Sequence, residues 1–145
     1  MKGKVLCVCL SDEKGVQKTP VDRLEVIADF GIKGDAHAGN WPRQVSLLAE
    51  ESADKLRQLG AEIHPGDFGE NILTQGVELS SLPVGAMLKV GEVSLQVTQI
   101  GKECHEHCAI FEAVGTCVMP TEGIFCRVVE GGTISGGDSI EEIDQ

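Results

Sequence analysis

The chain has 145 residues, of which 41% are hydrophobic and 24% charged, and its formal net charge is −11 at pH 7. A chain of this length can bury roughly two thirds of its unfolded surface in one core, so we expect a single domain over residues 1–145. The negative charge argues against binding to nucleic acid or to anionic membranes, because the long-range field repels both. An anionic ligand would therefore need a local cluster of Lys and Arg.

Six cysteines raise the question of disulfides and of the cellular compartment. The first residues, "MKGKVLCVCL", contain no signal-peptide pattern, so we expect a cytoplasmic protein with reduced thiols. No apolar run approaches the roughly 20 residues of a membrane helix, and we expect no association with a membrane. Cys7 and Cys9 lie two apart in an apolar run, where we expect them to pack rather than to form a bridge.

The first third of the chain predicts two strands and a loop. Residues 4–10 are a continuous apolar run with β-branched side chains, which is typical of a buried strand. In residues 23–30, alternate apolar side chains fall on one face, which predicts a second strand. The three glycines of residues 31–39 predict a loop.

Residues 49–59 predict the clear helix of the chain. Arg57 in the last turn and Gly60 just beyond it are typical of a helix end. The apolar side chains that recur at helical spacing are Ala49, Ala53, Leu56 and Leu59.

The second half of the chain predicts short strands separated by glycines. Residues 86–90 and 93–100 are apolar runs on either side of a Gly-Glu pair, as in a hairpin. Two more short strands are expected at about 124–129 and 133–140. Many short strands with regular glycine breaks and one helix predict a mainly β protein that forms a closed or nearly closed β-barrel.

A dense group of sulfur and imidazole ligands stands at residues 104–108, "CHEHC". Cys104 and Cys108 with His105 and His107 could form a structural zinc site, with further cysteines downstream. Zinc ligands usually come as two pairs separated by a longer loop, and adjacent Cys104 and His105 would strain a tetrahedron. The residue types are those of a zinc site, but their spacing argues against one.

The same residues could instead hold a reactive thiol. A cysteine becomes nucleophilic as the thiolate, which Lys102, His105 and His107 would favour. Such a thiolate could accept a sulfur atom as a persulfide or bind a soft metal. Cys108 precedes the apolar "AIF" and is interpreted as a packing residue, whereas Cys104 follows a glycine break and is the functional candidate.

Three glycine-rich stretches carry polar side chains that could contact a ligand. Asp35 can orient the imidazole of His37 or form a local turn. In residues 65–72, two glycines shape a turn from which Glu70 or Asn71 can face a ligand. Taken alone, each of these two stretches favours a structural role. The third stretch, "EGGTISGGD", has neither the strand-loop-helix context nor the lysine of a phosphate-binding loop, so it favours two turns between strands.

Taken together and in this order, five stretches resemble the MOSC domain, the family named for the C-terminal domain of molybdenum cofactor sulfurase. They are "GIKGDAHAG", "RQVSLLAEES", "PGDFGENILTQGVEL", "LPVGAMLKVGEVSLQVTQIGKECHEHC" and "EGIFCRVVEGGTISGGD". The resemblance implies a single MOSC domain over residues 1–145 with the length of the short stand-alone members. It implies a mainly β fold, a strongly bent barrel with the helix at about 49–59 and short helical turns.

The resemblance also implies a function. MOSC domains look like sulfur carriers that take sulfur from a pyridoxal-phosphate cysteine desulfurase onto a family cysteine and deliver it for metal-sulfur cofactor assembly. By motif position this cysteine is Cys104, and in larger relatives its equivalent binds molybdenum. The expected partners are a cysteine desulfurase as donor and a molybdoenzyme or cofactor-biosynthesis protein as acceptor. Pyridoxal phosphate would belong to the donor, and a sulfurtransferase-type activity stays open.

Molybdenum cofactor is a pterin dithiolene with a phosphate, so the resemblance implies a site with donors and positive charge. We expect His37 and Asn71, with Asp35, to hydrogen-bond this cofactor, and the glycines of the 31–39 loop to let it approach the backbone. The basic residues expected there are Lys33, Arg43, Lys102 and Arg127. The alternatives are the structural zinc module and a molybdenum-dependent reductase component, as in some larger relatives.

Overall fold

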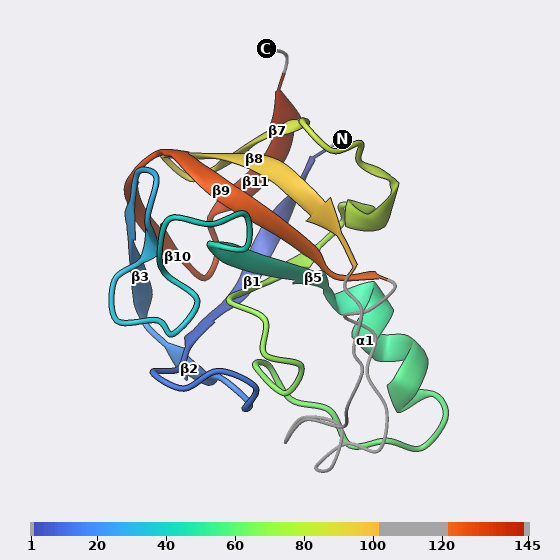
Figure 1. Cartoon of the computed structure of the whole chain (residues 1–145). Coiled ribbons are helices and arrows are strands. Elements are labelled where there is room, and N and C mark those ends of the chain that lie inside the picture. Colours follow the sequence, from blue (N-terminus) through green and yellow to red (C-terminus); the bar gives the residue numbers. More distant parts are fainter. Residues whose placement is uncertain (1, 102–121, 144–145) are drawn as a thin grey trace.

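The computed structural model describes residues 2–101 and 122–143, and Figure 1 shows their arrangement. Seven strands form a closed barrel in the order β11-β7-β8-β9-β5-β6-β1, which the pairing of β1 with β11 completes. The strands are β1 (Lys2–Leu10), β5 (Val45–Ala49), β6 (Ile72–Gln75), β7 (Met87–Val90), β8 (Val93–Ile100), β9 (Ile124–Glu130) and β11 (Ser139–Ile143). The predicted mainly β fold with a closed barrel is confirmed.

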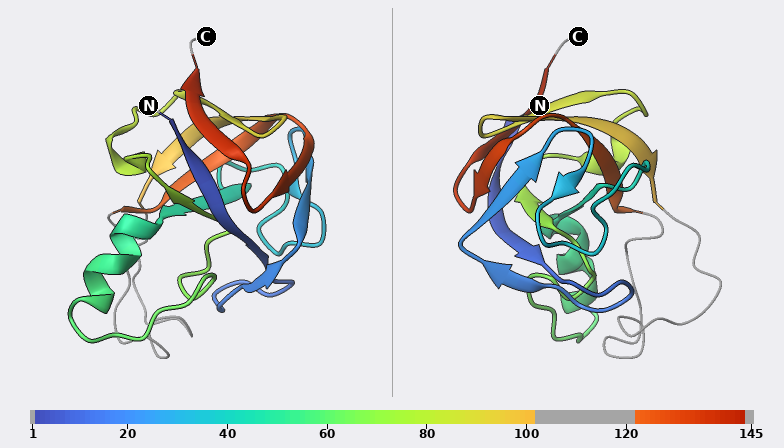
Figure 2. Two further views of the ribbon diagram at one scale, coloured as in Figure 1. Left: turned by 180° about the vertical axis from the view of Figure 1, so that it is seen from behind. Right: turned by 60° about the vertical axis from the view of Figure 1, so that its left-hand side comes forward.

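A second, three-stranded sheet lies beside the barrel, as Figure 2 shows from two further sides. It contains β3 (Arg23–Ile27), β4 (Gly31–Ile32) and β10 (Gly132–Ser135) in the order β10-β3-β4. Leu24, Val26 and Ile134 of this sheet belong to the same apolar cluster as the barrel interior. The sheet therefore shares one core with the barrel.

The helix α1 (Glu50–Arg57) connects β5 to β6, which pair in parallel. Ala53 and Leu56 face Leu48 of β5 and Leu73 of β6, in a second apolar cluster outside the barrel. The predicted helix is confirmed, but Leu59 lies beyond its last residue and is 83% exposed. Gly60 follows with a φ of 100°, a left-handed conformation that favours glycine at the end of a helix.

The predicted strands are present with two changes of boundary. The hairpin of β7 and β8 pairs Val90 with Val93 across a two-residue turn, as expected. The expected strand at 133–140 is two strands, because the chain turns at Gly136 and Gly137 and passes from β3 to the barrel. The expected strand at 23–30 ends at Ile27, where the turn to β4 places Asp29 in a left-handed conformation with φ 53°.

Shorter elements complete the described residues. The strand β2 (Thr19–Val21) extends the sheet beyond β1, and the 3-10 turn η1 (Leu79–Ser81) follows β6. Cys9 is buried, and half-buried Cys7 packs against the cluster beneath α1, so the expected packing of both is confirmed; neither is in a disulfide. None of the described helices is long and apolar enough to cross a membrane.

Candidate functional site

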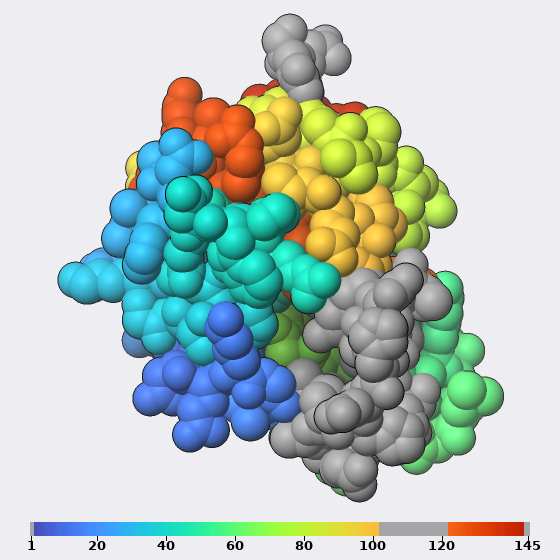
Figure 3. All heavy atoms as spheres, viewed as in Figure 1, coloured from blue at the N-terminus to red at the C-terminus, as the bar shows by residue number. Residues whose placement is uncertain are grey.

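The site is built on an ion pair that the fold removes from water. The chain after β1 forms a loop that brings Lys18 beneath the loop after β4, which carries Asp35. Lys18 Nζ lies 2.8 Å from Asp35 Oδ1, and both side chains are 0% exposed. Figure 3 shows the two loops side by side on one face, and Ala36 N donates to Ser11 O at 2.7 Å between them. A buried charge pair is costly to desolvate, so it requires further partners.

Asp35 has such partners on both carboxylate oxygens. Oδ1 accepts hydrogen bonds from Ser11 N and Asn71 Nδ2, each at 3.1 Å, and Oδ2 accepts one from His37 N at 3.1 Å. Burial alone would raise the pKa of Asp35, but the hydrogen bond and charge of Lys18 and the hydrogen bond from Ser11 N outweigh it and hold this pKa well below its usual range. Asp35 is therefore an ionised carboxylate at neutral pH.

Asn71 lies under the pair and joins it to the barrel. Its Oδ1 accepts from Ser46 N at 3.0 Å and from Ser46 Oγ at 3.1 Å, and its Nδ2 also donates to Cys9 O at 3.1 Å. The residue is 0% exposed. All the hydrogen-bonding groups of the Asn71 side chain are therefore engaged by protein, and Asn71 acts on the site by holding Asp35.

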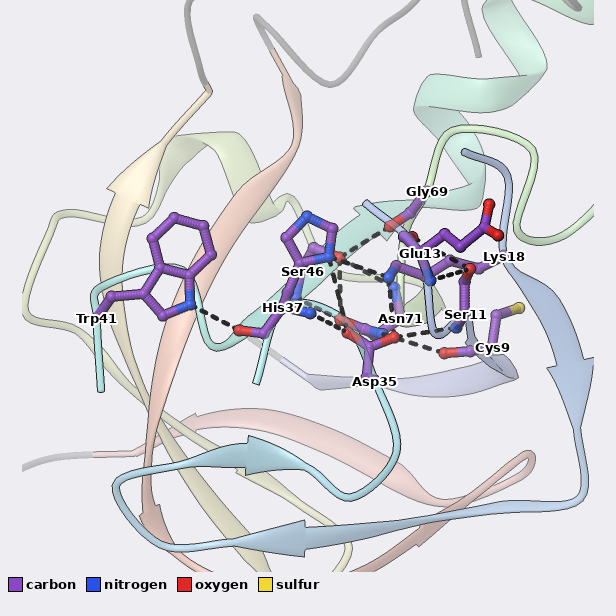
Figure 4. Close-up of polar contacts among 10 residues, drawn as sticks. All are labelled: Cys9, Ser11, Glu13, Lys18, Asp35, His37, Trp41, Ser46, Gly69 and Asn71. Atoms are coloured by element: carbon purple, nitrogen blue, oxygen red, sulfur yellow. Dashed lines mark hydrogen bonds and ion pairs between the residues drawn. The ribbon is translucent and has the colours of Figure 1, made fainter. Parts of the chain in front are cut away.

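His37 lies above the pair and reaches the surface. Its Nδ1 is 3.1 Å from Lys18 Nζ and 3.7 Å from Asp35 Oδ2, and its side chain is 22% exposed. Trp41 Nε1 donates to His37 O at 2.6 Å, and the two rings are nearly parallel with centroids 6.1 Å apart. Figure 4 shows His37 between the buried network and Trp41.

Two cationic side chains, Lys14 and Arg43, lie over the Trp41 ring. Lys14 Nζ is 4.9 Å and Arg43 Cζ 5.8 Å from the Trp41 ring centroid, within the range of cation–π attraction. Arg43 Nε also donates to Gln99 Oε1 at 3.1 Å, and Gln99 Nε2 donates to Gly101 O at 2.8 Å. Arg43 therefore links Trp41 to the end of β8, from which the chain continues into residues 102–121.

The turn before β6 fixes the backbone of Lys18. Lys18 N donates to Gly66 O at 2.8 Å, and a Cβ on Gly66 would lie 2.0 Å from Lys18 O. Buried Glu70 accepts hydrogen bonds from Gly66 N at 2.9 Å and Phe68 N at 3.2 Å, which shape the turn. Burial raises the pKa of Glu70 to about 7, although these hydrogen bonds act in the opposite direction.

The other predicted site residues are not part of this network. Lys33 is exposed and pairs with Glu25 at 3.6 Å. Arg127 of β9 contacts Gln96 of β8 and Asp29 of the turn between β3 and β4. The remaining ones, Lys102, Cys104, His105, His107 and Cys108, lie outside the described residues. The structure thus brings together Asp35, His37 and Asn71 and places Arg43 next to them through Trp41.

Sequence reasoning missed Lys18, Trp41 and Lys14. A lone Lys in the loop after a strand resembles any surface charge, and only the fold shows that its side chain is buried. A buried carboxylate requires a cationic partner, so burial of Asp35 would have indicated that a Lys or Arg lies next to it.

The chemistry of these side chains suits an anion. The exposed edge of His37, with Lys14 and Arg43 nearby, offers hydrogen-bond donors and positive charge. Within residues 2–101 and 122–143, no group of three His, Cys, Asp or Glu side chains could hold a metal ion.

The family model of the MOSC domain matches residues 34–141, so the stretch includes Asp35, His37, Asn71 and Arg127. The chain belongs to the MOSC domain family, which is generally linked to proteins of the molybdenum cofactor sulfurase type. The resemblance drawn from the sequence motifs is confirmed.

Solved structures agree with this assignment of the fold. The YuaD protein from Bacillus subtilis has a TM-score of 0.83 at 22% identity, covering 100% of this chain and 98% of that one. YiiM from Escherichia coli has a TM-score of 0.72 at 22% identity, covering 100% and 71%. YiiM from Geobacillus stearothermophilus has a TM-score of 0.73 at 18% identity, covering 98% and 75%. A comparison with the curated proteins finds no match.

Proposed function

We propose that this MOSC domain binds molybdenum cofactor, or a closely related pterin, and carries sulfur on Cys104 for cofactor assembly. The observation that supports it most is the convergence of separate family stretches on one network. Asp35 and His37 come from one stretch and Asn71 from another, and both His37 and Asn71 donate to the Asp35 carboxylate, which pairs with the buried Lys18 ammonium. Because the network ends at a partly exposed histidine, next to a tryptophan that two cations contact, it supports a binding site rather than a purely structural one.

The described residues fit the organic part of this cofactor. A phosphate would be held by His37 with Lys14 and Arg43, which lie over the neighbouring Trp41 ring. The described residues contain no metal-ligand group, so we assign the metal contact to Cys104 by its place in the family motif. The bound cofactor would supply the metal-sulfur chemistry, while these residues bind and orient it.

The proposed carrier step is a thiol-persulfide exchange. The Cys104 thiolate attacks the outer sulfur of a cysteine persulfide on the desulfurase, a new S–S bond forms on Cys104, and the donor cysteine leaves as a thiolate. No external oxidant or reductant is required, because one S–S bond replaces another. The same exchange passes the sulfur to a nucleophilic acceptor on the assembly partner.

The three described cysteines are poor candidates for the sulfur carrier. Burial raises the pKa of the Cys9 and Cys126 thiols far above their usual range, so neither forms the thiolate that exchange requires. Cys7 is half-buried and packs against the cluster beneath α1. Cys104 follows Gly101 by three residues in the sequence, close along the chain to Gln99 and its contact with Arg43.

Mass spectrometry after incubation with a cysteine desulfurase, cysteine and pyridoxal phosphate tests the carrier role. We expect the mass of one added sulfur, located by peptide mapping at Cys104 and absent from Cys104→Ala. Cys7→Ala is the matched control and should accept sulfur normally. Equal sulfur loading of Cys104→Ala would contradict the assignment. About one tightly bound zinc per chain, lost in Cys108→Ala, would replace it with the structural zinc module.

A further inference from the structure

The hydrogen-bond partners of His37 determine which ring nitrogen holds its proton. An ammonium group has three donors and no acceptor, so a hydrogen bond from Lys18 Nζ requires a lone pair on His37 Nδ1. The proton of the imidazole must then be on Nε2.

Lys18 prevents the opposite arrangement. Asp35 Oδ2 is 3.7 Å from His37 Nδ1, and a carboxylate at this distance favours a proton on the nitrogen that faces it. Lys18 Nζ is closer to Nδ1 and is charged because it is paired with Asp35 at 2.8 Å. The ammonium therefore supplies the hydrogen bond to Nδ1 that would otherwise go from a protonated Nδ1 to Asp35.

Trp41 fixes the orientation of the same ring independently. Its indole N–H holds the His37 carbonyl, and its ring is within 6° of parallel to the imidazole. Nε2 lies on the ring edge that points away from Lys18 and the buried network, as Figure 4 shows. An N–H on this edge is thus directed at whatever occupies the surface beside Trp41.

We propose that Lys18 is a positioning residue that fixes His37 as the Nε2–H tautomer, so that His37 donates to an oxyanion of the phosphate class, with Lys14 and Arg43 supplying the charge. The tautomer follows from the protein alone, whereas the ligand class rests on the proposed function. Sulfur loading of Cys104 does not depend on the tautomer, so the two proposals can fail separately.

Nitrogen-15 NMR of the histidine ring in the ligand-free protein tests the tautomer. We expect His37 to show a protonated Nε2 and an unprotonated Nδ1, with the signals assigned by their loss in His37→Gln. Lys18→Met removes the donor at similar side-chain length and should move the proton to Nδ1, which then faces Asp35 Oδ2. Lys18→Gln keeps an N–H donor without the charge and should retain the Nε2–H tautomer. The exposed His64 is the internal reference and should not change.

The position of the His37 ring proton separates a positioning role of Lys18 from a merely structural one. A wild-type His37 with its proton on Nδ1 would overturn the proposal, and this measurement needs no variant to fold. An unchanged Nε2–H tautomer in folded Lys18→Met would also overturn it.

The ligand class is tested by titrating inorganic phosphate into the protein. We expect the His37 Nε2 signal of the wild type to shift. Phosphate binding should weaken about tenfold in Lys18→Met, since the charge-assisted hydrogen bond from His37 Nε2–H is lost. No shift of Nε2 at saturating phosphate would overturn the assignment of an oxyanion.

Discussion

Lys18 and Asp35 form an ion pair whose two side chains have no contact with water. Removing one charge of such a pair leaves the other buried and uncompensated, which costs far more than the pair contributes. The pair is hydrogen-bonded to Ser11, His37 and Asn71, so its loss would also disturb the position of the partly exposed His37 imidazole. Stability and site geometry are therefore linked at these residues.

The Asp35→Asn variant tests this link at the residue scale. We expect it to lower the free energy of unfolding by about 3–5 kcal/mol, because Lys18 keeps its charge without a counter-ion. The double variant Lys18→Met/Asp35→Asn should recover a large part of the loss. Urea denaturation of the four members of this cycle measures the coupling. Losses that simply add would show that the two side chains do not act as a pair.

Glu70 predicts a pH dependence of stability. Its pKa rises from 4.5 to about 7 on folding, so its contribution is complete below pH 4.5 and is lost as the pH rises toward 7. The loss amounts to about 3 kcal/mol. Glu70→Gln cannot ionise, and we expect the free energy of unfolding of this variant to change less across this pH range than that of the wild type. Parallel pH profiles of the two proteins, measured by urea denaturation, would contradict the raised pKa.

At the scale of elements, the turn before β6 holds the backbone of Lys18 in place through the hydrogen bond from Lys18 N to Gly66 O. Gly66 has φ 88° and no room for a Cβ next to Lys18 O, whereas Gly34 has φ 86° and nothing within 4 Å of a Cβ. The two glycines share a backbone conformation and differ in their surroundings. They form a matched pair of positions for separating backbone strain from the contact with Lys18.

We expect Gly34→Ala to cost about 1–2 kcal/mol, the price of a left-handed alanine. Gly66→Ala should cost about 1–3 kcal/mol more, because its methyl group must displace the Lys18 backbone. It should also alter the His37 ring signals, which Gly34→Ala should leave unchanged. Thermal or urea denaturation and nitrogen-15 NMR provide the two measurements. Equal costs in the two variants would mean that the turn does not support Lys18.

At the scale of the whole molecule, one core joins the barrel and the second sheet. Ile140 of β11 lies where the barrel closes, paired with Gly3 of β1 and Val90 of β7, and it is fully buried. Because the strands form a ring, loosening this seam removes support from every strand. We infer that the described residues unfold cooperatively rather than by loss of a separate sheet.

Ile140→Ala tests this cooperativity. We expect it to cost about 2–5 kcal/mol, as for other large-to-small core changes. Circular dichroism and the fluorescence of Trp41 should report the same unfolding midpoint, because Trp41 lies in the loop between the second sheet and the barrel. Ile27→Ala, at a position that is 44% exposed, is the control and should change stability by less than about 1 kcal/mol. Separate midpoints for the two probes would contradict a single cooperative unit.

The sequence predicted most of the fold because its elements depend on local patterns. Alternating Val93, Leu95 and Val97 are all buried, and the helix at 49–59 is present as Glu50–Arg57. Leu59 shows that periodicity does not fix the end of a helix: it fits the apolar helical spacing, but it lies beyond the last helical residue and is exposed. The division of 133–140 into two strands was missed because glycines predict a turn without telling which sheet the chain enters next.

The site was predicted only in part, for a physical reason. Asp35, His37 and Asn71 stand in recognisable glycine-rich stretches, but their partner Lys18 is 17 residues from Asp35 in a loop without a motif. Asn71 is 36 residues from Asp35, and only the barrel brings the two side chains together. Lys18 matters to the site because its side chain is buried, and burial is a property of the folded chain that the neighbouring sequence does not show.

The central claim is that the surface around His37 and Trp41 binds molybdenum cofactor. Trp41 is the single tryptophan of the chain, so its fluorescence reports on this surface directly. We predict a saturable fluorescence change, with one site per chain, on titration with cofactor released anaerobically from a purified molybdoenzyme. Binding should weaken at least about tenfold in His37→Phe and stay unchanged in Lys33→Met, which removes an exposed cation that pairs with Glu25. No saturable change in the wild type, or equal binding by His37→Phe, would contradict the claim.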